Sequence, residues 1–304
     1  MNKPLLTSSQ AIPGILDIDE SESGLTRLKI TTATCNAEIY LQGAHLTQWQ
    51  PAGSDPVLFL SERTAIQPGK AIRGGVPVIF PWFGARSATP NSTRTDGPSH
   101  GFARTAIWQL ASATTSGDNL HLTLTLEPNQ LSRSFGYDDF LATYKVTLGL
   151  ELLLEFSVQN QSQKPIYFEE ALHTYFAVGD ATKITIDGLG DTEYLDKTDG
   201  FKRKRQTETL LSLSGETDRP YVNSTAPIVI EDPAIRRRIS IAKQNSKTTV
   251  IWNPWAELTA KLADMPPDGW MRMVCVETAN VGENVVCLAP GETHTMDARI
   301  IVVG

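Results

Sequence analysis

A regular alternation of apolar and polar residues constrains this chain more than any other feature. It is clearest in residues 119–127, where every second position is a leucine with polar neighbours. Side chains along a β-strand point alternately to opposite faces, so the pattern indicates a strand with one buried face and one face in water.

The same period recurs along most of the chain, in segments bounded by Gly, Pro, Asn and Asp, whereas helical patterns are few. Many short strands with hardly any intervening helices favour an all-β fold, a large antiparallel β-sandwich, over a β-α-β architecture. The predicted strands are residues 27–34, 37–49, 119–127, 140–148, 151–158, 166–176, 183–187, 226–230, 237–242, 248–252, 270–277 and 293–303, and the predicted short helices are residues 62–66, 129–135 and 255–264.

The 304 residues show no internal repeat and no low-complexity linker. A large all-β sandwich often forms one domain even when it is longer than the usual ~150 residues. We therefore expect a single domain that spans residues 1–304.

The formal net charge of −7 gives no general attraction to nucleic-acid backbones or to anionic lipid. Two basic runs, residues 201–206 (FKRKRQ) and 236–238, are expected to be solvated loops in an acidic chain without a basic surface interleaved with aromatics. We expect neither nucleic acid nor a membrane as a partner. An anionic ligand would need a local basic cluster.

The three cysteines, Cys35, Cys275 and Cys287, are odd in number and lack CxxC spacing, which fits a reducing compartment. Cys275 and Cys287 lie in apolar runs and are expected in the core. The first twenty residues lack the basic start and the continuous apolar region of a signal peptide, and no run reaches the ~18 apolar residues of a membrane span. We expect a cytoplasmic protein.

The segment RGGVPVIFPWFG, residues 73–84, combines two adjacent glycines, two prolines and three aromatic residues with Arg73. Glycines let a backbone approach a ligand closely, and prolines fix the loop that does so. One interpretation is a ligand-binding loop. The other is a buried crossover between sheets, with Arg73 in a structural ion pair, and composition favours neither.

The segment PSHGFAR, residues 98–104, follows a polar loop and leads into an expected strand. His100 and Arg104 lie four residues apart at the mouth of that strand, so both can point the same way. Arg104 could form a small anion site with Arg73, with Lys70 as a further candidate, because guanidinium groups bind phosphate through two hydrogen bonds. Phosphate is the anion we expect.

His173 lies in FEEALHTYFAVGD, residues 168–180, which alternates like a half-buried strand. The alternation would place Glu169, Ala171 and Tyr175 on the same face as His173, a polar and aromatic stripe suited to the wall of a sugar pocket. A lone histidine in a strand is more often a satisfied structural residue. His173 therefore needs a partner to act as a proton donor.

Glu277 is the candidate partner. It ends the near-continuous apolar strand of WMRMVCVETANV, residues 270–281, so partial desolvation should raise its pKa toward the range of a general base. The alternative is a strand-end glutamate that caps a turn at residues 278–280. Together, His173 and Glu277 supply the acid and the base that reversible proton transfer requires.

Two further motifs have structural interpretations of their own. Asp218 lies in ETDRPY, residues 216–221, where an aspartate usually forms an Asx turn. Trp252 and Trp255 flank a turn in WNPWAE, where we expect core packing, with stacking on a sugar as the alternative.

Six motifs in this order resemble those of the hexose-6-phosphate mutarotases, the glucose-6-phosphate 1-epimerases of the aldose 1-epimerase superfamily. They are RGGVPVIFPWFG, HGFAR, ALHTYFAVGD, TDRPY, IWNPW and MVCVETANV, spread over most of the chain. The resemblance implies a galactose-mutarotase-like β-sandwich with a sugar cleft on one concave face. It implies an isomerase that needs no metal or redox cofactor, and we expect a monomer that binds a small sugar phosphate.

Carried over by position, the resemblance places the general acid on His173 and the general base on Glu277. The positions that the family uses around the sugar and its phosphate are matched by Arg73, His100, Arg104 and Asp218. After the base, this chain has Thr-Ala-Asn at residues 278–280, where the wider superfamily more often has Pro-Gly-Asn. The expected loop after the base therefore lacks its turn-setting pair.

The expected activity is interconversion of the α and β anomers of a hexose 6-phosphate, with glucose 6-phosphate as the first candidate, by acid- and base-catalysed opening and closure of the ring. Two alternatives stay open. The chain could be a mutarotase for unphosphorylated aldoses, or a carbohydrate-binding protein without catalysis. A matched acid and base argue against the second alternative, because a pure binder needs neither.

Overall fold

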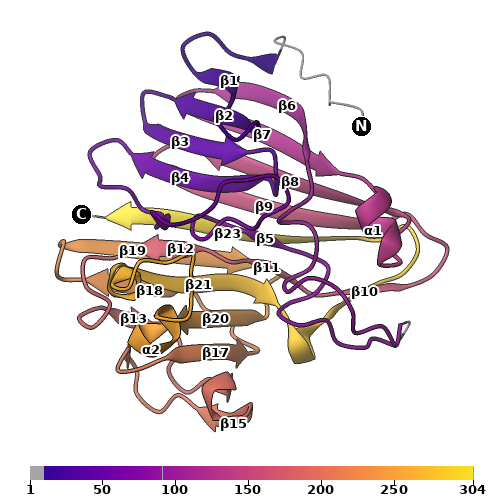
Figure 1. Cartoon of the computed structure of the whole chain (residues 1–304). Coiled ribbons are helices and arrows are strands. Elements are labelled where there is room, and N and C mark those ends of the chain that lie inside the picture. The colour runs from indigo at the N-terminus through magenta and orange to yellow at the C-terminus, as the bar shows by residue number, and fades with distance from the viewer. Residues whose placement is uncertain (1–9, 91, 304) are drawn as a thin grey trace.

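The computed structural model describes residues 10–90 and 92–303 and consists mainly of antiparallel strands in two layers (Figure 1). One layer holds a four-stranded and an eight-stranded sheet side by side. The other is a nine-stranded sheet that extends behind both in the view of Figure 1. The predicted antiparallel all-β sandwich is confirmed.

The sheets are made of strands from distant parts of the chain. The four-stranded sheet contains, in order, β1 (Leu16–Glu20), β2 (Thr26–Thr31), β3 (Cys35–Tyr40) and β4 (His45–Pro51). The nine-stranded sheet contains, in order, β16 (Leu211–Ser212), β13 (Thr185–Asp187), β18 (Ile228–Asp232), β19 (Arg237–Gln244), β23 (Thr293–Val303), β9 (Glu151–Asn160), β8 (Phe140–Leu148), β7 (Asn119–Leu126) and β6 (Gln109–Ser116).

The eight-stranded sheet carries the residues of interest. It contains, in order, β15 (Lys202–Arg205), β14 (Glu193–Asp196), β17 (Thr217–Val222), β20 (Thr248–Asn253), β21 (Met273–Asn280), β11 (Glu170–Leu172) and β5 (Val78–Ile79), and β12 (Tyr175–Ala177) also pairs with β21. A separate pair is formed by β10 (Ile166–Phe168) and β22 (Val286–Leu288). The helices are α1 (Gln130–Ser134) and α2 (Trp255–Thr259), with 3-10 turns η2 (Lys197–Asp199), η3 (Gly269–Arg272) and η4 (Gly282–Asn284).

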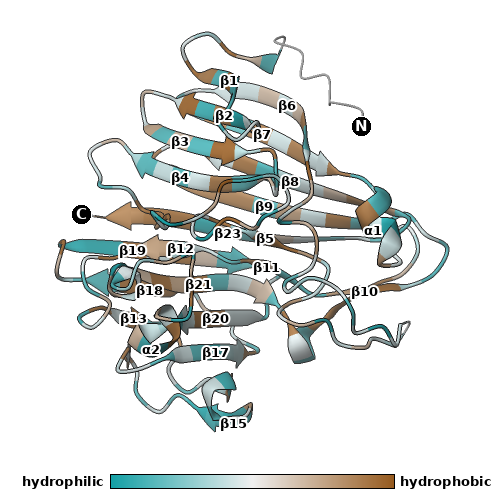
Figure 2. Cartoon of the chain, in the orientation of Figure 1, coloured by the Kyte–Doolittle hydropathy of each residue, from teal (hydrophilic) through white to brown (hydrophobic). Residues whose placement is uncertain are grey.

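Alternation along the strands directs one face of each sheet into a shared core. In β9, buried residues alternate with partly exposed ones along the whole strand, and Figure 2 shows such bands of hydrophobic and hydrophilic residues along the strands. Trp49 of β4 is fully buried and donates its indole N–H to the Gly149 carbonyl between β8 and β9. This bond ties the four-stranded sheet to the nine-stranded one.

Phe80, which follows β5 directly, anchors the next loop to this core. Its ring centroid lies 5.3–6.0 Å from those of five aromatic residues, Phe102, Tyr137, Phe140, Phe156 and Phe168. Aromatic rings in edge-on and tilted contact add to the free energy of burial. The packing of Phe80 therefore holds the start of the loop that continues to Phe83 in place.

Some predicted elements are wrong. Residues 37–49 form two strands, β3 and β4, because the chain turns at Gly43, whose φ is +77°. Residues 166–176 form β10, β11 and β12 instead of one strand, and residues 62–66 contain a turn at residues 62–63 and no helix. Cys287 is exposed, whereas Cys275 is buried as expected.

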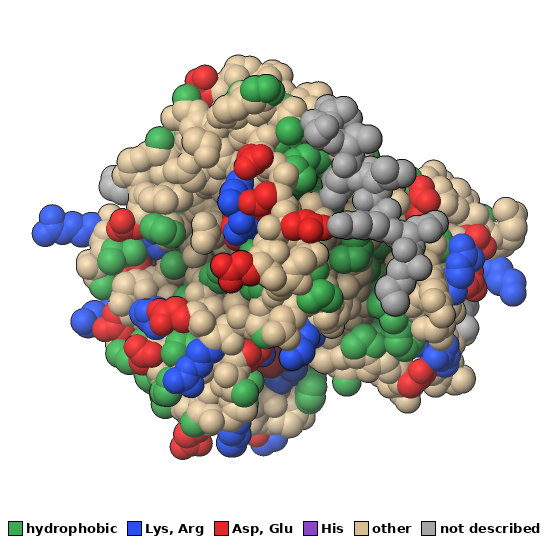
Figure 3. All heavy atoms as spheres, turned by 45° about the horizontal axis from the view of Figure 1, so that its top comes forward, with side chains coloured by type: hydrophobic (Ala, Val, Ile, Leu, Met, Phe, Trp, Pro, Cys, Tyr) green, Lys and Arg blue, Asp and Glu red, His purple; other side chains and the backbone are tan. Residues whose placement is uncertain are grey.

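Part of the basic run 201–206 forms the edge strand β15 instead of a loop. Its charged side chains face carboxylates, since Lys202 lies 2.8 Å from Asp199 and Arg205 lies 2.9 Å from Asp191. Acidic and basic side chains are interspersed on the face drawn in Figure 3. No helix in residues 10–90 and 92–303 is long and apolar enough to cross a membrane.

Gly74 and Gly75 lie against the protein's own backbone. A Cβ atom on Gly75 would lie 2.3 Å from the Leu46 carbonyl oxygen, and one on Gly74 would lie 2.4 Å from the Phe59 carbonyl oxygen. Both glycines also have positive φ, +119° at Gly74 and +62° at Gly75. The glycine pair thus serves the crossover between sheets, which is the second of the two interpretations of this segment.

We predict that Gly75→Ala destabilises the fold more than Gly117→Ala. Gly117 has a φ of +57° and nothing within 4 Å of an added Cβ, so it shares the backbone conformation of Gly75 without the contact. We expect Gly117→Ala to lower the free energy of unfolding by about 1 kcal/mol, and Gly75→Ala by a further ~1–3 kcal/mol from overpacking. Urea denaturation measures both, and equal losses would show that the contact is unimportant.

Candidate active site

His173 and Glu277 are brought together by strand register. β11 ends one residue before His173 and β12 begins two residues after it, and both pair with β21 in the same register. That register places His173 opposite Glu277. In the gap, the His173 backbone N–H donates to the Pro77 carbonyl, so the interruption stays hydrogen-bonded.

Glu277 lies within β21 and not at its end, because β21 continues to Asn280 and pairs there with β11 and β20. The alternative of a strand-end glutamate capping a turn is therefore wrong. So is the expected loop directly after Glu277, since residues 278–280 are strand. Because residues 278–280 form a strand, this chain needs no turn there, and the absence of a Pro-Gly pair leaves no turn unformed.

The two side chains face each other in a buried environment. His173 is 7% exposed and Glu277 is 1% exposed, and the Nδ1 of His173 lies 3.5 Å from the Oε1 of Glu277. Nδ1 of His173 and Oε2 of Glu277 have no hydrogen-bond partner among the described residues. A buried polar atom without a partner costs roughly 1–3 kcal/mol, so this pair is not explained by its contribution to stability.

Burial moves the two pKa values in opposite directions. Desolvation, followed by the charge of the neighbouring carboxylate Asp218, raises the pKa of Glu277 well above its usual value, and Lys197 opposes the rise. Desolvation lowers the pKa of His173, and His100, Arg104 and Arg73 lower it further. Burial therefore favours the neutral form of both side chains.

Aromatic rings fix the imidazole of His173. The ring of Tyr175 is stacked on it, with centroids 4.9 Å apart and planes 8° apart. The rings of His100 and Trp252 lie edge-on, with centroids 5.4 and 6.1 Å from that of His173. Trp252 thus contacts the proposed acid and is not only a core residue.

Asp218 lies on the same face of the sheet as Glu277. It is opposite Trp252, and Trp252 is opposite Cys275, two residues before Glu277 on β21. Asp218 belongs to β17, so the expectation of an Asx turn is wrong. Its carboxylate lies 2.7 Å from the Nζ of Lys197, and burial raises its pKa.

Arg73 reaches the site from the crossover segment. Its Nη1 donates to the Tyr175 hydroxyl at 3.1 Å, and its Nε donates to Asp264 at 3.1 Å. Two of the five guanidinium N–H groups are used in these bonds, and the others remain available to an anion. Arg73 is therefore both in an ion pair and directed to the site.

Arg104 and His100 lie in a turn and not at the mouth of a strand. Arg104 donates to the Ser99 carbonyl at 2.6 Å. His100 has a φ of +64°, and its pKa falls to about 3, first through burial and then through the charges of Arg104, Lys197 and Arg73. The neutral form of His100 is therefore favoured. Lys70 is exposed.

All six predicted site residues thus lie in one neighbourhood of the eight-stranded sheet and its loops. The residues that sequence reasoning missed are Lys197, Phe83 and Asp264. Lys197 pairs with Asp218, and its Nζ lies 5.5 Å from the centroid of the Phe83 ring. No sequence signal separates Lys197 or Asp264 from the other charged residues of the chain, because only the fold brings them to the site.

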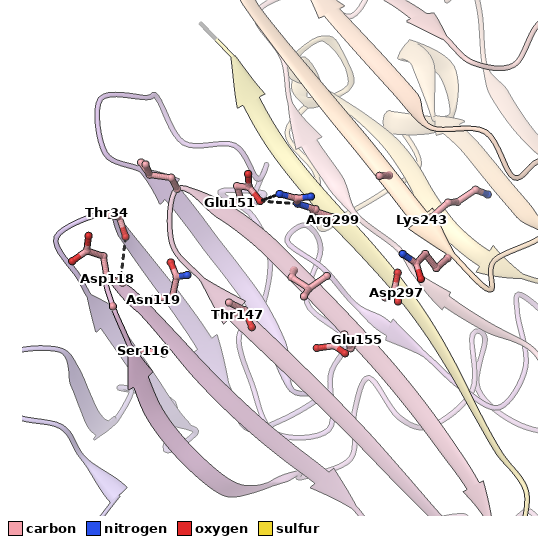
Figure 4. A pocket seen from close by; sticks show the side chains of 15 residues that line it. Thr34, Ser116, Asp118, Asn119, Thr147, Glu151, Glu155, Lys243, Asp297 and Arg299 are labelled. Carbon is pink, nitrogen blue, oxygen red and sulfur yellow. Dashed lines mark hydrogen bonds and ion pairs between the residues drawn. The ribbon is translucent and has the colours of Figure 1, made fainter.

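A hollow elsewhere on the molecule contains none of these residues. It has a volume of about 810 Å³ and lies over the solvent-facing side of β8, β9 and β23, where Glu151 and Arg299 form an ion pair (Figure 4). It is lined by threonines, carboxylates and two basic residues, without a histidine. Among residues 10–90 and 92–303, no group of three or more His, Cys, Asp or Glu side chains could hold a metal ion.

We predict that Glu277→Gln stabilises the folded protein at pH 8. The raised pKa means that the folded state binds this proton more tightly than the unfolded chain, so stability falls as the pH rises above the usual glutamate value. Glutamine does not ionise and avoids this loss. The gain in free energy of unfolding over wild type should shrink as the pH falls toward 5, as urea denaturation at both pH values can show.

The matched control is Glu22→Gln, at an exposed position, which should change the free energy of unfolding by less than about 0.5 kcal/mol. A Glu277→Gln protein less stable than wild type at both pH values would contradict the prediction.

Comparison with known proteins identifies the family of the chain. The sequence profile of the family described as aldose 1-epimerase matches residues 26–300. A protein of Escherichia coli (strain K12) named "Putative glucose-6-phosphate 1-epimerase" is 40% identical over 249 residues, which is 81% of this chain and 80% of that protein.

Solved structures show the same fold. The crystal structure of a "putative mutarotase" from Salmonella typhimurium matches with a TM-score of 0.89 and 30% identity, over 97% of this chain and 95% of the other. Galactose 1-epimerase from Lactobacillus acidophilus NCFM shares the fold at 13% identity, with a TM-score of 0.72 over 95% of this chain and 98% of the other. The predicted fold and isomerase class are confirmed, and the chain belongs to the aldose 1-epimerase family.

Proposed function

We propose that this chain interconverts the α and β anomers of a hexose 6-phosphate, with glucose 6-phosphate as the preferred substrate. The observation that carries the proposal is the buried pair of His173 and Glu277, 3.5 Å apart, beside two arginines. A buried acid and base suit reversible proton transfer, and guanidinium groups suit a phosphate. The E. coli relative carries a name with this substrate.

In the proposed mechanism, Glu277 takes the proton of the C1 hydroxyl while His173 protonates the ring oxygen. The bond between C1 and the ring oxygen breaks, which leaves the open-chain aldehyde. Rotation about the C1–C2 bond presents the other face of the carbonyl. The C5 hydroxyl then adds to that face, His173 takes its proton back, and Glu277 returns one to the new C1 hydroxyl.

The charges around the pair fit one orientation of the sugar. Arg73 and Arg104 act on the pKa of His173, whereas the charges that act on Glu277 are Asp218 and Lys197. In a hexose 6-phosphate, the ring oxygen is bonded to C5, which carries the phosphorylated C6. An acid that protonates the ring oxygen therefore belongs beside the phosphate site, and the base at C1 belongs on the other side.

Phosphate would also assist the acid. Arg73 and Arg104 lower the pKa of His173, and a bound phosphate dianion would offset their positive charge. The pKa of His173 would then rise, which favours the protonated form that the first step needs. Remote binding energy from the phosphate would at the same time orient C1 toward Glu277.

We predict that His173→Asn and Glu277→Gln each lower the rate of anomer exchange of glucose 6-phosphate by at least ~10²-fold, the usual contribution of one acid or base. Saturation-transfer NMR measures this exchange directly. His121→Asn is the matched control, because His121 lies on β7 with its ring bonded to Thr147. Undiminished exchange in either site variant would overturn the assignment of that residue.

A second prediction concerns the substrate. Replacing Arg73 and Arg104 together by Ala should lower the ratio of kcat/KM for glucose 6-phosphate to that for glucose by roughly 10²-fold, because each charged hydrogen bond contributes about tenfold. Arg238→Ala, an exposed ion-pair residue, should leave the ratio unchanged. An unchanged ratio in the double variant would favour the mutarotase for unphosphorylated aldoses.

A further inference from the structure

Tyr175 touches both parts of the proposed site. Its ring is stacked on the imidazole of His173, with centroids 4.9 Å apart and planes 8° apart. Its hydroxyl accepts a hydrogen bond of 3.1 Å from Nη1 of Arg73. The side chain therefore spans the distance between the proposed acid and the proposed phosphate ligand.

Tyr175 is itself held firmly. It is 3% exposed and begins β12, where it lies opposite Cys275 of β21. Its ring also meets that of Trp252 edge-on, with centroids 5.9 Å apart. Because the strand and a second aromatic ring fix its side chain, Tyr175 can hold His173 and Arg73 in a constant position relative to each other.

We propose that Tyr175 is a positioning residue that couples phosphate recognition to proton transfer. The inference rests on the proposed function and goes beyond it by giving a role to a residue that need not touch the sugar. The ring sets the plane of the His173 imidazole, and the hydroxyl sets the direction of the Arg73 guanidinium. An Arg73 bound to phosphate is thus held in a fixed relation to the acid.

The chemistry of the hydroxyl suits this role. Burial raises the pKa of Tyr175, so the phenol stays neutral and its oxygen accepts the hydrogen bond from Arg73. Asp264 holds the Nε edge of the same guanidinium at 3.1 Å. With two edges fixed, the remaining N–H donors of Arg73 point in a defined direction, as a bidentate phosphate bond requires.

The ring and the hydroxyl can be tested separately. Tyr175→Phe keeps the stacked ring and removes the bond to Arg73, so KM for glucose 6-phosphate should rise about tenfold, as expected for one hydrogen bond to a charged group, with a much smaller change in kcat. Tyr175→Leu removes the flat ring as well and should lower kcat. Tyr144→Phe is the matched control, since the Tyr144 hydroxyl is buried in the core without a hydrogen-bond partner among the described residues.

A double-mutant cycle tests the coupling itself. If the hydroxyl acts through Arg73, Tyr175→Phe should change KM by less than about twofold when Arg73 is already Ala. Independent effects on KM, or a Tyr175→Phe protein with the KM of wild type, would overturn the inference. Should Tyr175→Leu not fold, the near-isosteric Phe variant and the cycle still decide.

Failure of the proposed function would look different. In that case the wild-type protein would not accelerate anomer exchange of glucose 6-phosphate. An active wild type whose Phe variant loses kcat and not KM would refute only the positioning role of the Tyr175 hydroxyl.

Discussion

The candidate site depends on two titratable side chains that the fold buries opposite each other. His173 and Glu277 are far apart in the chain and meet because β11 and β12 pair with β21 in one register. Neither forms a hydrogen bond with the other, and each leaves a buried polar atom without a partner among the described residues. Such a pair costs stability, so the apolar sheets around it must supply the free energy that keeps it in place.

The fold was largely predictable because alternation is a local signal. A strand with one wet face shows its period in a few residues, as in β8 and β23, whose predicted bounds agree with the structure. Prediction failed where a single residue changes the direction of the chain without changing the period. Gly43 divides one apolar stretch into β3 and β4, and the gap at His173 is invisible in a sequence that alternates across it.

The site was only partly predictable, for a related reason. The chemistry of His173, Glu277 and the two arginines marks them as candidates, and the resemblance to a known family strengthened them. What no local pattern shows is which charge lies beside which. The 2.7 Å contact of Lys197 with Asp218 and the bond from Arg73 to Tyr175 arise from strands and loops that only the register of the sheet makes neighbours.

Burial and the neighbouring charges also decide which protonation states of His173 and Glu277 the site favours at each stage of the reaction. Burial, an acidic neighbour at Glu277 and basic neighbours at His173 all favour the neutral forms of the pair. In the proposed mechanism, a protonated Glu277 and a neutral His173 are the state reached when the ring has opened, not the state in which it starts. Without phosphate, the protein thus favours the protonation states of the open-chain stage. A bound phosphate that offsets the charge of the two arginines would favour protonated His173, the form needed while the sugar ring is closed. Balance between the two stages is what a reversible isomerase needs, so in this mechanism the phosphate acts on the chemistry as well as on binding.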